Sequence, residues 1–370
     1  MNKKILFLTL RVFSVAGGIE RVCRIAGKAL YEFSDGPDAD YNVYSMYGKS
    51  SDVNVQYFPA ENFHGFAINK PSYTISSFKK GIKSDIVILS HINLLLIGFL
   101  IKVFSPKTKL VLIAHGIEVW IILPGWKKNM LKKTDCILAV SNYTKEKMIA
   151  LNHLDPEKIT VLNNCLDPFL PKPGNDKKDE NLMKKYGLSE NDTVLATLSR
   201  FSITEKYKGY DEVIKVIHLL SQDYPNLKYL LIGKYDAEEK NRINQLIEES
   251  NLANAVIFAG YIPDEELASH YNLADIFIMP SKKEGFGIAF IEAMYYGKPV
   301  IAGNKDGSVD ALLNGKLGLL VNPDSEEEIS QALRKIISNR QQYLPNHQLL
   351  MQHFSYEVYK NNLKQTIALL

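Results

Sequence analysis

The 370-residue sequence has only three cysteines, and their spacing matches neither a disulfide framework nor a metal-binding motif. Cys23 and Cys136 lie in apolar-patterned segments, which predicts that they are small core residues. Cys165 is the third cysteine. A chain without paired cysteines suits a reducing compartment, so we expect a cytoplasmic protein.

The sequence also lacks a clean membrane-spanning run. Residues 86–101 are the longest candidate, but they contain Ser90, His91 and Asn93, which favours a buried strand leading into a core helix. The N-terminal lysines and apolar run imitate a signal peptide, but Arg11 interrupts that run. We therefore interpret this segment as a first β-strand.

Neither sign of charge dominates the chain, whose net charge is +3. The first 169 residues carry 21 Lys and Arg against 14 Asp and Glu, whereas the remainder carries 23 against 27. A basic first half fits an anionic partner or membrane surface, and random surface charge explains the asymmetry equally well. Peripheral contact with an anionic membrane is also suggested by a cluster of Trp and Lys, and a solvated helix end is an equally ordinary reading. This cluster comprises Trp120, Trp126, Lys127, Lys128, Lys132 and Lys133.

Short β-rich runs alternate with helical patterns throughout, which predicts an α/β chain of parallel sheets with crossover helices. The predicted strands cover residues 4–9, 41–46, 85–90, 109–115, 136–141, 193–199, 228–233, 255–260, 275–280 and 299–302. The helical patterns include residues 19–33, 142–151, 211–223, 237–251, 265–274 and 354–370. Residues 168–192 are rich in Pro, Gly and charge, so we predict a boundary near Pro171 between two doubly wound domains.

Two glutamates follow the predicted strand 275–280. Glu284 lies in a glycine-flanked loop, and Glu292 follows eight residues later on a helix that starts near Gly287. This loop lies at the carboxyl end of a parallel strand, where ligands bind in open α/β sheets. The helix start offers free amides and a positive dipole end, which suit an anion. A phosphorylated, hydroxyl-rich ligand is the expected occupant.

Two cations follow another strand at the same edge. Arg200 and Lys208 come after the strand 193–199, and together they suit a diphosphate. Two carboxylates would also suit a glycosidase, but a hydrolase has no use for a diphosphate site. We therefore expect one glutamate to bind a sugar and the other a nucleotide ribose.

The first half contributes fewer signals. Gly17 and Gly18 open a helix, but they do not form GxGxxG, so a nicotinamide cofactor is disfavoured. His115 ends a central strand, where a structural role and a ligand contact are equally plausible. No His, Cys and Asp cluster has metal-ligand spacing, and Asp38-Ala39-Asp40 lies in a loop, so we expect no metal and no cofactor.

The segment from Glu284 to Met294, with the later motifs GKPVIA and GLLVNP, closely resembles the E-x7-E signature of retaining glycosyltransferases of family 4. Gly17-Gly18, His115-Gly116, Ser141-Asn142, Arg200 and Lys208 resemble other motifs of that family, so the likeness spans nearly the whole chain. The resemblance implies the GT-B fold, in which two Rossmann-like domains face each other across a cleft. The implied domains are an acceptor-binding domain of residues 1–170, joined by a C-terminal helix of residues 355–370, and a nucleotide-sugar-binding domain of residues 171–354.

By the same resemblance, Glu284 and His115 would be the catalytic residues. The donor-binding residues would be Gly18, Arg200, Lys208, Tyr261, Ile262, Gly285, Phe286, Gly287, Ile288, Ala289 and Glu292. Glu284 would bind the donor sugar, Glu292 the ribose, and Tyr261 and Ile262 the base. The sequence departs from the family pattern in three places: the hinge segment is Asn163-Asn164-Cys165-Leu166-Asp167, Lys206 rivals Lys208, and the usual Gly-Gly is Asp306-Gly307.

The implied activity is transfer of a sugar, with retention and without a metal, to a saccharide or lipid-linked saccharide acceptor in polysaccharide biosynthesis. We expect a UDP-sugar donor, UDP-glucose or a related hexose, because such donors are common in the family. A GDP-mannose-dependent mannosyltransferase, a nucleotide-sugar epimerase on the same fold and a binding module without transfer activity are the alternatives. Membrane contact would place the protein on the inner face of the plasma membrane, and nothing in the sequence indicates a nucleic-acid partner.

Overall fold

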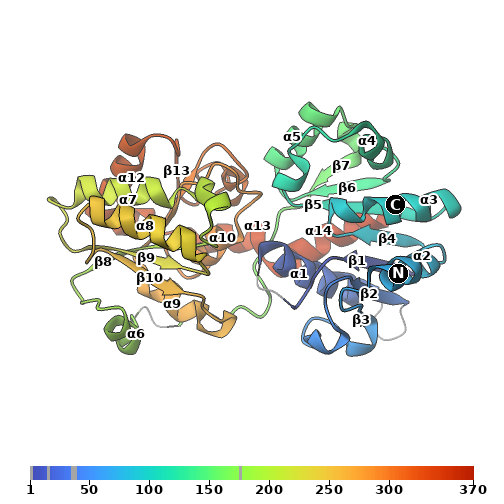
Figure 1. Ribbon diagram of the computed structural model, residues 1–370, viewed down its shortest axis with the longest axis horizontal. Helices are drawn as coiled ribbons and strands as arrows, with labels where there is room; N and C mark the ends of the chain where they lie inside the picture. Colours follow the sequence, from blue (N-terminus) through green and yellow to red (C-terminus); the bar gives the residue numbers. More distant parts are fainter. Residues whose placement is uncertain (1–2, 15–16, 35–39, 175–176) are drawn as a thin grey trace. The chain divides into compact units, whose positions relative to one another are not determined.

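The computed structural model describes residues 3–14, 17–34, 40–174 and 177–370. The chain forms two compact units, one made of Met1–Pro168 with Phe354–Leu370 and the other of Phe169–His353. Each unit is built on a parallel β-sheet with helices on both faces (Figure 1). This confirms the predicted fold class of two Rossmann-like α/β domains. Of the Asp-x-Asp sequence, Asp38 and Ala39 lie outside the described residues.

The sheet of the first unit has the strand order β3-β2-β1-β4-β5-β6-β7, and all its paired strands are parallel. Its strands are β1 (Ile5–Thr9), β2 (Tyr41–Ser45), β3 (Phe63–Gly65), β4 (Ile86–Leu89), β5 (Lys109–Ala114), β6 (Cys136–Ala139) and β7 (Ile159–Val161). The five strands predicted in this half correspond to β1, β2, β4, β5 and β6. The sequence patterns missed β3 and β7, because three residues are too few to show a period.

Side chains of β1 alternate between two hydrophobic cores, one on each face of the sheet. Ile5 and Phe7 pack into the core that also receives α1 (Gly18–Phe33) and α14 (Tyr356–Ala368). Leu6 and Leu8 pack into the opposite core. That core receives α2 (Lys70–Gly81), α3 (Leu95–Phe104), α4 (Gly125–Leu131) and α5 (Asn142–Asn152). Because both faces are covered, the strands are apolar along their whole length.

Three expectations about hydrophobic segments are met. Residues 86–101 form β4 and most of α3, and the N-terminal apolar run forms β1. Cys23 and Cys136 belong to the first core, and Cys165 is also buried and unpaired. No helix within the described ranges is long and apolar enough to cross a membrane.

The sheet of the second unit has the strand order β10-β9-β8-β11-β12-β13 and is also parallel. Its strands are β8 (Thr193–Leu198), β9 (Leu227–Ile232), β10 (Val256–Gly260), β11 (Ile276–Met279), β12 (Val300–Gly303) and β13 (Leu319–Val321). Its helices are α6 (Glu180–Lys185), α7 (Tyr210–Leu220), α8 (Ala237–Glu249), α9 (Leu267–Leu273), α10 (Ile288–Tyr295), α11 (Ser308–Ala311), α12 (Glu326–Ser338) and α13 (His347–Phe354). All five strands predicted in this half are confirmed, and the short β13 was missed.

The final helix α14 belongs to the first unit, although 185 residues of the second unit precede it in the chain. Its residues Tyr359, Leu363 and Ile367 are buried in the core beside α1. Tyr356 Oη and Lys360 Nζ both donate to Glu32 Oε2 on α1, at 2.9 and 3.0 Å. The C-terminal end of the chain thus completes the core of the first unit.

In both sheets the first strand lies between the second and the fourth, so the strand order reverses beside β1 and beside β8. Ligands of open α/β sheets bind outside the carboxyl ends of the strands at such a position, because the connections on its two sides lead to opposite faces of the sheet. In the second unit this position lies between β8 and β11. Arg200 and Lys208 follow the first of these strands, and Glu284 follows the second.

Candidate active site

The segment between β11 and α10 carries the glycine turn that positions Glu284. Strand β11 stops at Met279 before Pro280, and α10 begins at Ile288. Gly287 precedes the helix with a φ of +89°, where an added Cβ would come within 2.3 Å of the Phe290 ring. Only glycine fits this turn, which points the first amides of α10 toward the end of the sheet.

The segment that leads into α10 is largely enclosed. Phe286, Gly287 and Ile288 are buried, whereas Gly285 and Ala289 are half-buried. All five were predicted to bind the donor, and the amides of Gly287, Ile288 and Ala289 were predicted to hold its diphosphate. The arrangement gives them partial positive charge near the reversal point of the sheet.

Glu284 forms an ion pair with Lys208, and both side chains are mostly shielded from solvent. The contact joins Lys208 Nζ to Glu284 Oε2. Burial lowers the pKa of Lys208, but the Glu284 carboxylate raises it, and the result lies above the ordinary value. Lys208 is therefore a cation throughout the physiological pH range. Lys206, the rival residue, is exposed and does not occupy this position.

Backbone contact between two loops explains why Lys208 reaches Glu284. Gly209 has a φ of +83°, and an added Cβ there would lie 2.3 Å from the carbonyl oxygen of Pro280. The backbone amide of Lys282 also donates to the Tyr207 carbonyl at 2.8 Å. The loop after β8 is thus held against the loop after β11, and the Lys208 side chain extends along it to the carboxylate.

Arg200 stands at the same edge, with 65% of its side chain exposed. Its guanidinium is bound by Glu205, and this hydrogen bond raises the pKa of Arg200. The sequence did not single out Glu205, because nothing in the spacing of a polar loop shows which residue will turn back toward the arginine. The pair holds the guanidinium at the end of β8.

Glu292 lies on the second turn of α10 and is completely buried. Tyr271 Oη on α9 donates to Glu292 Oε2 at 2.9 Å, and the Tyr271 ring stacks on Tyr296 at 5.3 Å between ring centroids. A buried carboxylate needs such partners, because an unpaired one is costly. Tyr271 was not foreseen from the sequence. The assignment of Glu292 to a ribose stays a prediction.

Asp306 has turned its carboxylate inward, toward the Glu284 segment. It accepts from Ser281 Oγ at 2.6 Å, from the Glu284 amide at 2.6 Å and from the Ser308 amide at 2.9 Å. Only 1% of the residue is exposed. Burial raises the pKa of Asp306 to about 6, although these hydrogen bonds act in the opposite direction.

The predicted base-binding loop follows β10. Tyr261 is half exposed, and the Lys234 ammonium lies 4.7 Å from the centre of its ring. Ile262 is buried. Gly260 adopts a φ of +78°, and its carbonyl accepts from the Gly233 amide at 2.8 Å, which ties the loop to the end of β9.

The remaining predicted residues lie in the first unit. His115 follows β5 and is buried, and its Nε2 contacts the carbonyl oxygen of Ser90 at 2.7 Å. Because a carbonyl only accepts, Nε2 must carry a proton, and Nδ1 is then the acceptor of the neutral ring. Gly18 starts α1 after β1 and is exposed, with no atom within 4 Å of an added Cβ. Both residues lie at the carboxyl edge of their sheet.

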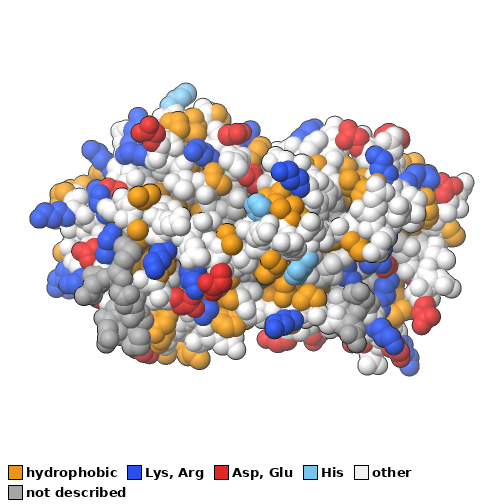
Figure 2. Space-filling view, turned by 180° about the vertical axis from the view of Figure 1, so that it is seen from behind, with side chains coloured by type: hydrophobic (Ala, Val, Ile, Leu, Met, Phe, Trp, Pro, Cys, Tyr) orange, Lys and Arg blue, Asp and Glu red, His pale blue; other side chains and the backbone are white. Residues whose placement is uncertain are grey.

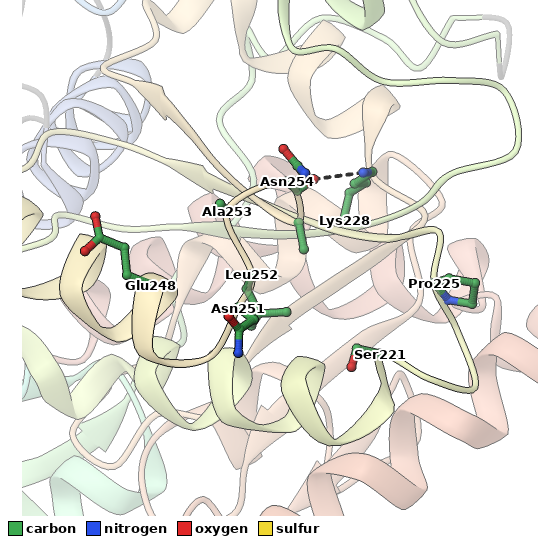
Figure 3. A pocket seen from close by; sticks show the side chains of 9 residues that line it. Ser221, Pro225, Lys228, Glu248, Asn251, Leu252, Ala253 and Asn254 are labelled. Atoms are coloured by element: carbon green, nitrogen blue, oxygen red, sulfur yellow. Dashed lines mark hydrogen bonds between the residues drawn. The ribbon is translucent and has the colours of Figure 1, made fainter.

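One pocket of the second unit is separate from this site. A surface pocket of about 480 Å³ is lined by residues such as Ser221, Lys228 and Asn254 (Figure 3). It lies near the amino ends of β9 and β10, at the edge opposite Glu284, and Lys228 Nζ donates there to the Asn254 carbonyl. Over the described parts of the chain, no three His, Cys, Asp or Glu side chains gather in a way that would hold a metal ion.

Two family models match the chain. Residues 17–168 match the model described as Glycosyltransferase Family 4, and residues 178–349 match the model described as Glycosyl transferases group 1. Together the two matches cover most of both units. The E-x7-E segment lies within the second match.

Similar curated proteins include a GDP-mannose-dependent alpha-(1-6)-phosphatidylinositol monomannoside mannosyltransferase of Mycobacterium tuberculosis (strain CDC 1551 / Oshkosh). It is 30% identical over 245 residues, which are 61% of this chain and 60% of that protein. A D-inositol 3-phosphate glycosyltransferase of Corynebacterium glutamicum (strain R) is 30% identical over 210 residues, or 55% of this chain and 49% of that protein. The chain thus matches these relatives over three fifths of their length or less.

Among solved structures, Anabaena Alr3699/HepE in complex with UDP-glucose superposes with a TM-score of 0.82. The likeness covers 100% of both chains at 19% sequence identity. At this identity the comparison shows the fold alone. That fold is GT-B, as the sequence motifs predicted.

Proposed function

Because the chain belongs to the glycosyltransferases of family 4 and group 1, we propose that it moves a sugar from a UDP-sugar to a saccharide or lipid-linked saccharide acceptor. The donor in this proposal is UDP-glucose or a related hexose, and the process is polysaccharide biosynthesis. The reaction retains the anomeric configuration and needs no metal ion. The observation that supports it best is the Lys208–Glu284 pair beside the α10 amides, at the reversal point of the second sheet.

The cations and amides at this edge fit the leaving group. When the bond between C1 of the sugar and the diphosphate oxygen breaks, negative charge grows on the diphosphate. Lys208, Arg200 and the first amides of α10 are preorganised to stabilise that charge, which is the role a metal ion plays in other transferases. Glu205 keeps the Arg200 guanidinium in place before the donor arrives.

Glu284 is assigned to the donor sugar. Its carboxylate accepts hydrogen bonds from sugar hydroxyls while one of its oxygens stays on Lys208, so the sugar and the diphosphate are positioned by one connected pair. The acceptor oxygen attacks C1 on the face from which the diphosphate departs, and its proton passes to the departing diphosphate. Retention follows without a covalent bond to the enzyme.

The remaining roles are less direct. His115 offers Nδ1 as an acceptor to a sugar hydroxyl, because its Nε2 proton is used by Ser90. Glu292 is assigned to the ribose, Tyr261 and Ile262 to the base, and Gly18 to a close backbone approach to the donor. The acceptor belongs to the first unit in this proposal.

GDP-mannose is the second candidate donor, and a specific finding favours it. The Mycobacterium tuberculosis relative is described as GDP-mannose-dependent, whereas the structural neighbour was solved with UDP-glucose. The residues described above contact a diphosphate and a sugar in either case. The choice of base must therefore be made by the loop that carries Tyr261 and Ile262.

A panel of nucleotide sugars tests the function. Release of nucleoside diphosphate from UDP-glucose, UDP-galactose and GDP-mannose is measured with and without saccharide acceptors and with a chelator. We expect turnover of a UDP-hexose, and this turnover should continue in the presence of the chelator. NMR of the product should show an axial linkage formed from an axial donor. Turnover of GDP-mannose alone would overturn the donor assignment, and an isomerised sugar formed without acceptor would indicate an epimerase.

We also propose that the protein works at the cytoplasmic face of the plasma membrane, in contact with anionic lipids. Of the large hydrophobic side chains exposed in the described part of the first unit, eight of twelve lie between residues 96 and 126. Four of these, Leu96, Leu100, Val103 and Phe104, follow one another at helical spacing along α3. An exposed apolar stripe of this kind marks an interaction surface.

The neighbouring residues make this surface basic. Residues 95–134 contain seven lysines and one acidic residue, Glu118. The Glu118 carboxylate accepts from the amides of His115 and Gly116, at 2.6 and 3.2 Å, so it faces the protein. Trp126 is exposed beside the lysines of α4, which contacts α3. On the whole face shown in Figure 2, Lys and Arg side chains lie interspersed with Asp, Glu and hydrophobic ones, so the excess of lysine is read from the sequence of this segment. Lysines beside exposed apolar side chains suit an anionic bilayer.

Vesicle co-sedimentation of the full chain tests this contact. We expect binding to vesicles that contain phosphatidylglycerol, weaker binding at high salt and little binding to phosphatidylcholine alone. The double variant with Phe104→Ser and Ile122→Ser should bind vesicles less. The control Leu219→Ser, at a residue of the second unit that is 57% exposed, should bind as the natural protein does. Vesicle binding that is independent of lipid charge and unchanged in these variants would contradict the proposal. A dimer that is lost in the double variant would also contradict it, because the surface would then be an interface between two copies of the chain.

A further inference from the structure

Asp306 occupies an unusual place for a carboxylate. It follows β12 and lies almost without exposed surface beside the segment that carries Glu284. An exposed loop aspartate would be hydrated, whereas this one has exchanged water for protein donors. Such an exchange is maintained only when the donors are well placed.

The carboxylate joins two segments by complementary hydrogen bonds. Asp306 Oδ2 accepts from the Glu284 amide, and the Glu284 carbonyl in turn accepts from the Gly307 amide at 2.8 Å. The two backbones touch, since a Cβ added to Gly307 would lie 2.0 Å from the Gly285 carbonyl oxygen. The same Oδ2 accepts from Ser281 Oγ, so the loop is held on both sides of Lys282 and Lys283.

We propose that Asp306 is a positioning residue of the donor site, which holds the Glu284 segment in its donor-binding conformation only while its carboxylate is ionised. The inference rests on the proposed function, because it assigns Glu284 to the donor sugar. Asp306 itself need not touch the donor. It acts through the Glu284 backbone.

The hydrogen bonds that the Asp306 carboxylate accepts explain why its ionisation matters. The ionised carboxylate accepts three hydrogen bonds, two on Oδ2 and one on Oδ1. Two of the three donors are backbone amides, which cannot reverse their polarity. A proton on Oδ2 would compete with the Glu284 amide for that oxygen, and a proton on either oxygen would weaken the hydrogen bonds that remain, because a neutral carboxyl is a poorer acceptor than a carboxylate.

Burial brings this change into an accessible pH range, because it raises the pKa of Asp306 to about 6. Several charged groups on the same segments form ion pairs. Lys208 binds Glu284, Lys282 pairs with Glu212 and Asp324, and Lys305 pairs with Asp324. Lys283 and Asp310 are the other charged residues on these segments. Lysines stay charged from pH 5 to 8, and the diphosphate of a nucleotide sugar does too.

Simple electrostatics predicts the opposite trend, so the inference is open to a clear test. If Asp306 acted mainly as a negative charge near the diphosphate, its protonation would strengthen donor binding. If it acts by positioning Glu284, protonation would weaken binding. The sign of the pH dependence distinguishes the two.

The experiment measures kcat and the donor KM between pH 5 and 8 for the full chain and for Asp306→Asn, with the best donor of the panel. For the natural protein we expect the donor KM to rise about tenfold below pH 6, with a smaller change in kcat. Asp306→Asn should show the raised KM at pH 7.5 and lose that part of the pH dependence. Burial lowers the pKa of His91, and any dependence that it contributes would persist in the variant, which separates it from Asp306.

Asp192→Asn is the matched control. Asp192 is also buried in the second unit, and its carboxylate accepts from the Ser189 amide at 2.7 Å, on a different segment. It should leave the donor KM and its pH dependence unchanged. A donor KM that decreases as the pH is lowered in the natural protein, or an Asp306→Asn profile identical to that of the natural protein, would overturn the inference. Absence of turnover with every donor in the natural protein would instead count against the proposed function. If Asp306→Asn fails to fold, the sign of the natural protein's profile still decides.

Discussion

The ion pair between Lys208 and Glu284 links two tasks that the sequence suggested separately. Lys208 was expected at the diphosphate and Glu284 at the sugar, and the structure places them in direct contact. Each side chain restricts the other, so neither has to be immobilised when a donor arrives. Preorganisation of this kind is where transferases gain most of their electrostatic advantage.

The pair should behave as a unit in mutagenesis. We expect Glu284→Gln and Lys208→Met each to lower kcat/KM by about 100-fold, and the double variant to be little worse than either. The reason is that loss of one partner leaves the other misplaced. A double-mutant cycle on kcat/KM measures this coupling. Lys206→Met, at the exposed neighbouring lysine, is the control and should change kcat/KM little; additive losses for the pair would argue against the linked roles.

Asp306 should also affect stability, with a sign opposite to its effect on function. Its folded pKa of about 6 lies above the ordinary value of 3.8, so the folded protein binds a proton more tightly than the unfolded chain. The contribution of Asp306 to the free energy of unfolding is therefore fully present below pH 4. It is lost as pH rises through 6, and amounts to about 3 kcal/mol.

Denaturant unfolding at several pH values checks this expectation. The difference in unfolding free energy between the natural protein and Asp306→Asn should decrease from pH 4 to pH 7, because only the natural protein must ionise a buried group. Asp192→Asn again provides the comparison for a buried carboxylate elsewhere. A difference that stays constant with pH would mean that Asp306 titrates as an ordinary carboxyl.

At the residue scale, sequence reasoning located candidate groups but not their partners. Glu284 and Arg200 were found because each follows an apolar strand, a signal that depends on position along the chain. Glu205, Tyr271 and the hydrogen bonds of Asp306 depend on side chains that meet through space. No spacing rule encodes them, since the contacts follow from how loops turn after the strands are paired.

At the scale of elements, two glycines decide where the loops go. Gly209 and Gly287 both have positive φ, and both lie against neighbouring atoms where a side chain would collide. Gly209 packs on Pro280, the residue that follows β11 and precedes the Glu284 loop. The geometry of the site is therefore set by a close backbone approach between two loops.

Gly209→Ala should thus be more harmful than an ordinary glycine substitution. The new Cβ would lie 2.3 Å from the Pro280 carbonyl oxygen, so the loop must move and Lys208 must shift away from Glu284. We expect a loss of at least about 2 kcal/mol in unfolding free energy together with reduced kcat/KM.

Gly187→Ala is the matched control for this substitution. Gly187 also has a positive φ, of +63°, but no atom lies within 4 Å of an added Cβ. The substitution should lower the free energy of unfolding by only about 1 kcal/mol, through backbone strain, and leave kcat/KM unchanged. Equal effects of the two substitutions on stability and activity would show that the contact with Pro280 is unimportant.

Elements with a long apolar run or a clear helical period were predictable from the sequence, including all ten strands named from their patterns. The three strands that were missed, β3, β7 and β13, have three residues each. They lie at sheet edges, where pairing to an existing strand stabilises a segment with little intrinsic preference. Such strands form because a neighbouring strand is available for pairing, and their own residues give little signal in the sequence.

At the scale of the whole molecule, the chain forms one unit from a continuous segment and the other from two separated segments. The C-terminal helix α14 contributes Tyr359, Leu363 and Ile367 to the first core. The strength of that contribution can be measured by truncating one of these side chains.

Leu363→Ala should destabilise the first unit by about 3 kcal/mol, because Leu363 is fully enclosed in its core. Hydrogen exchange followed by mass spectrometry should show faster exchange in β1 and α1 and little change in β8 and β9. Leu369→Ala, at a residue that is 88% exposed, should change neither. Equal acceleration in both units would mean that they unfold together.

The position of α14 has a consequence for the order of events on the ribosome. Proteins usually fold domain by domain as they are synthesised, beginning at the N-terminus. Here the second unit, a continuous segment, has all its residues before the helix that completes the first. The first unit, although its translation begins earlier, has one flank of its core uncovered until α14 emerges. The second unit can therefore fold before the first is complete, and α14 closes the unit whose translation began earlier.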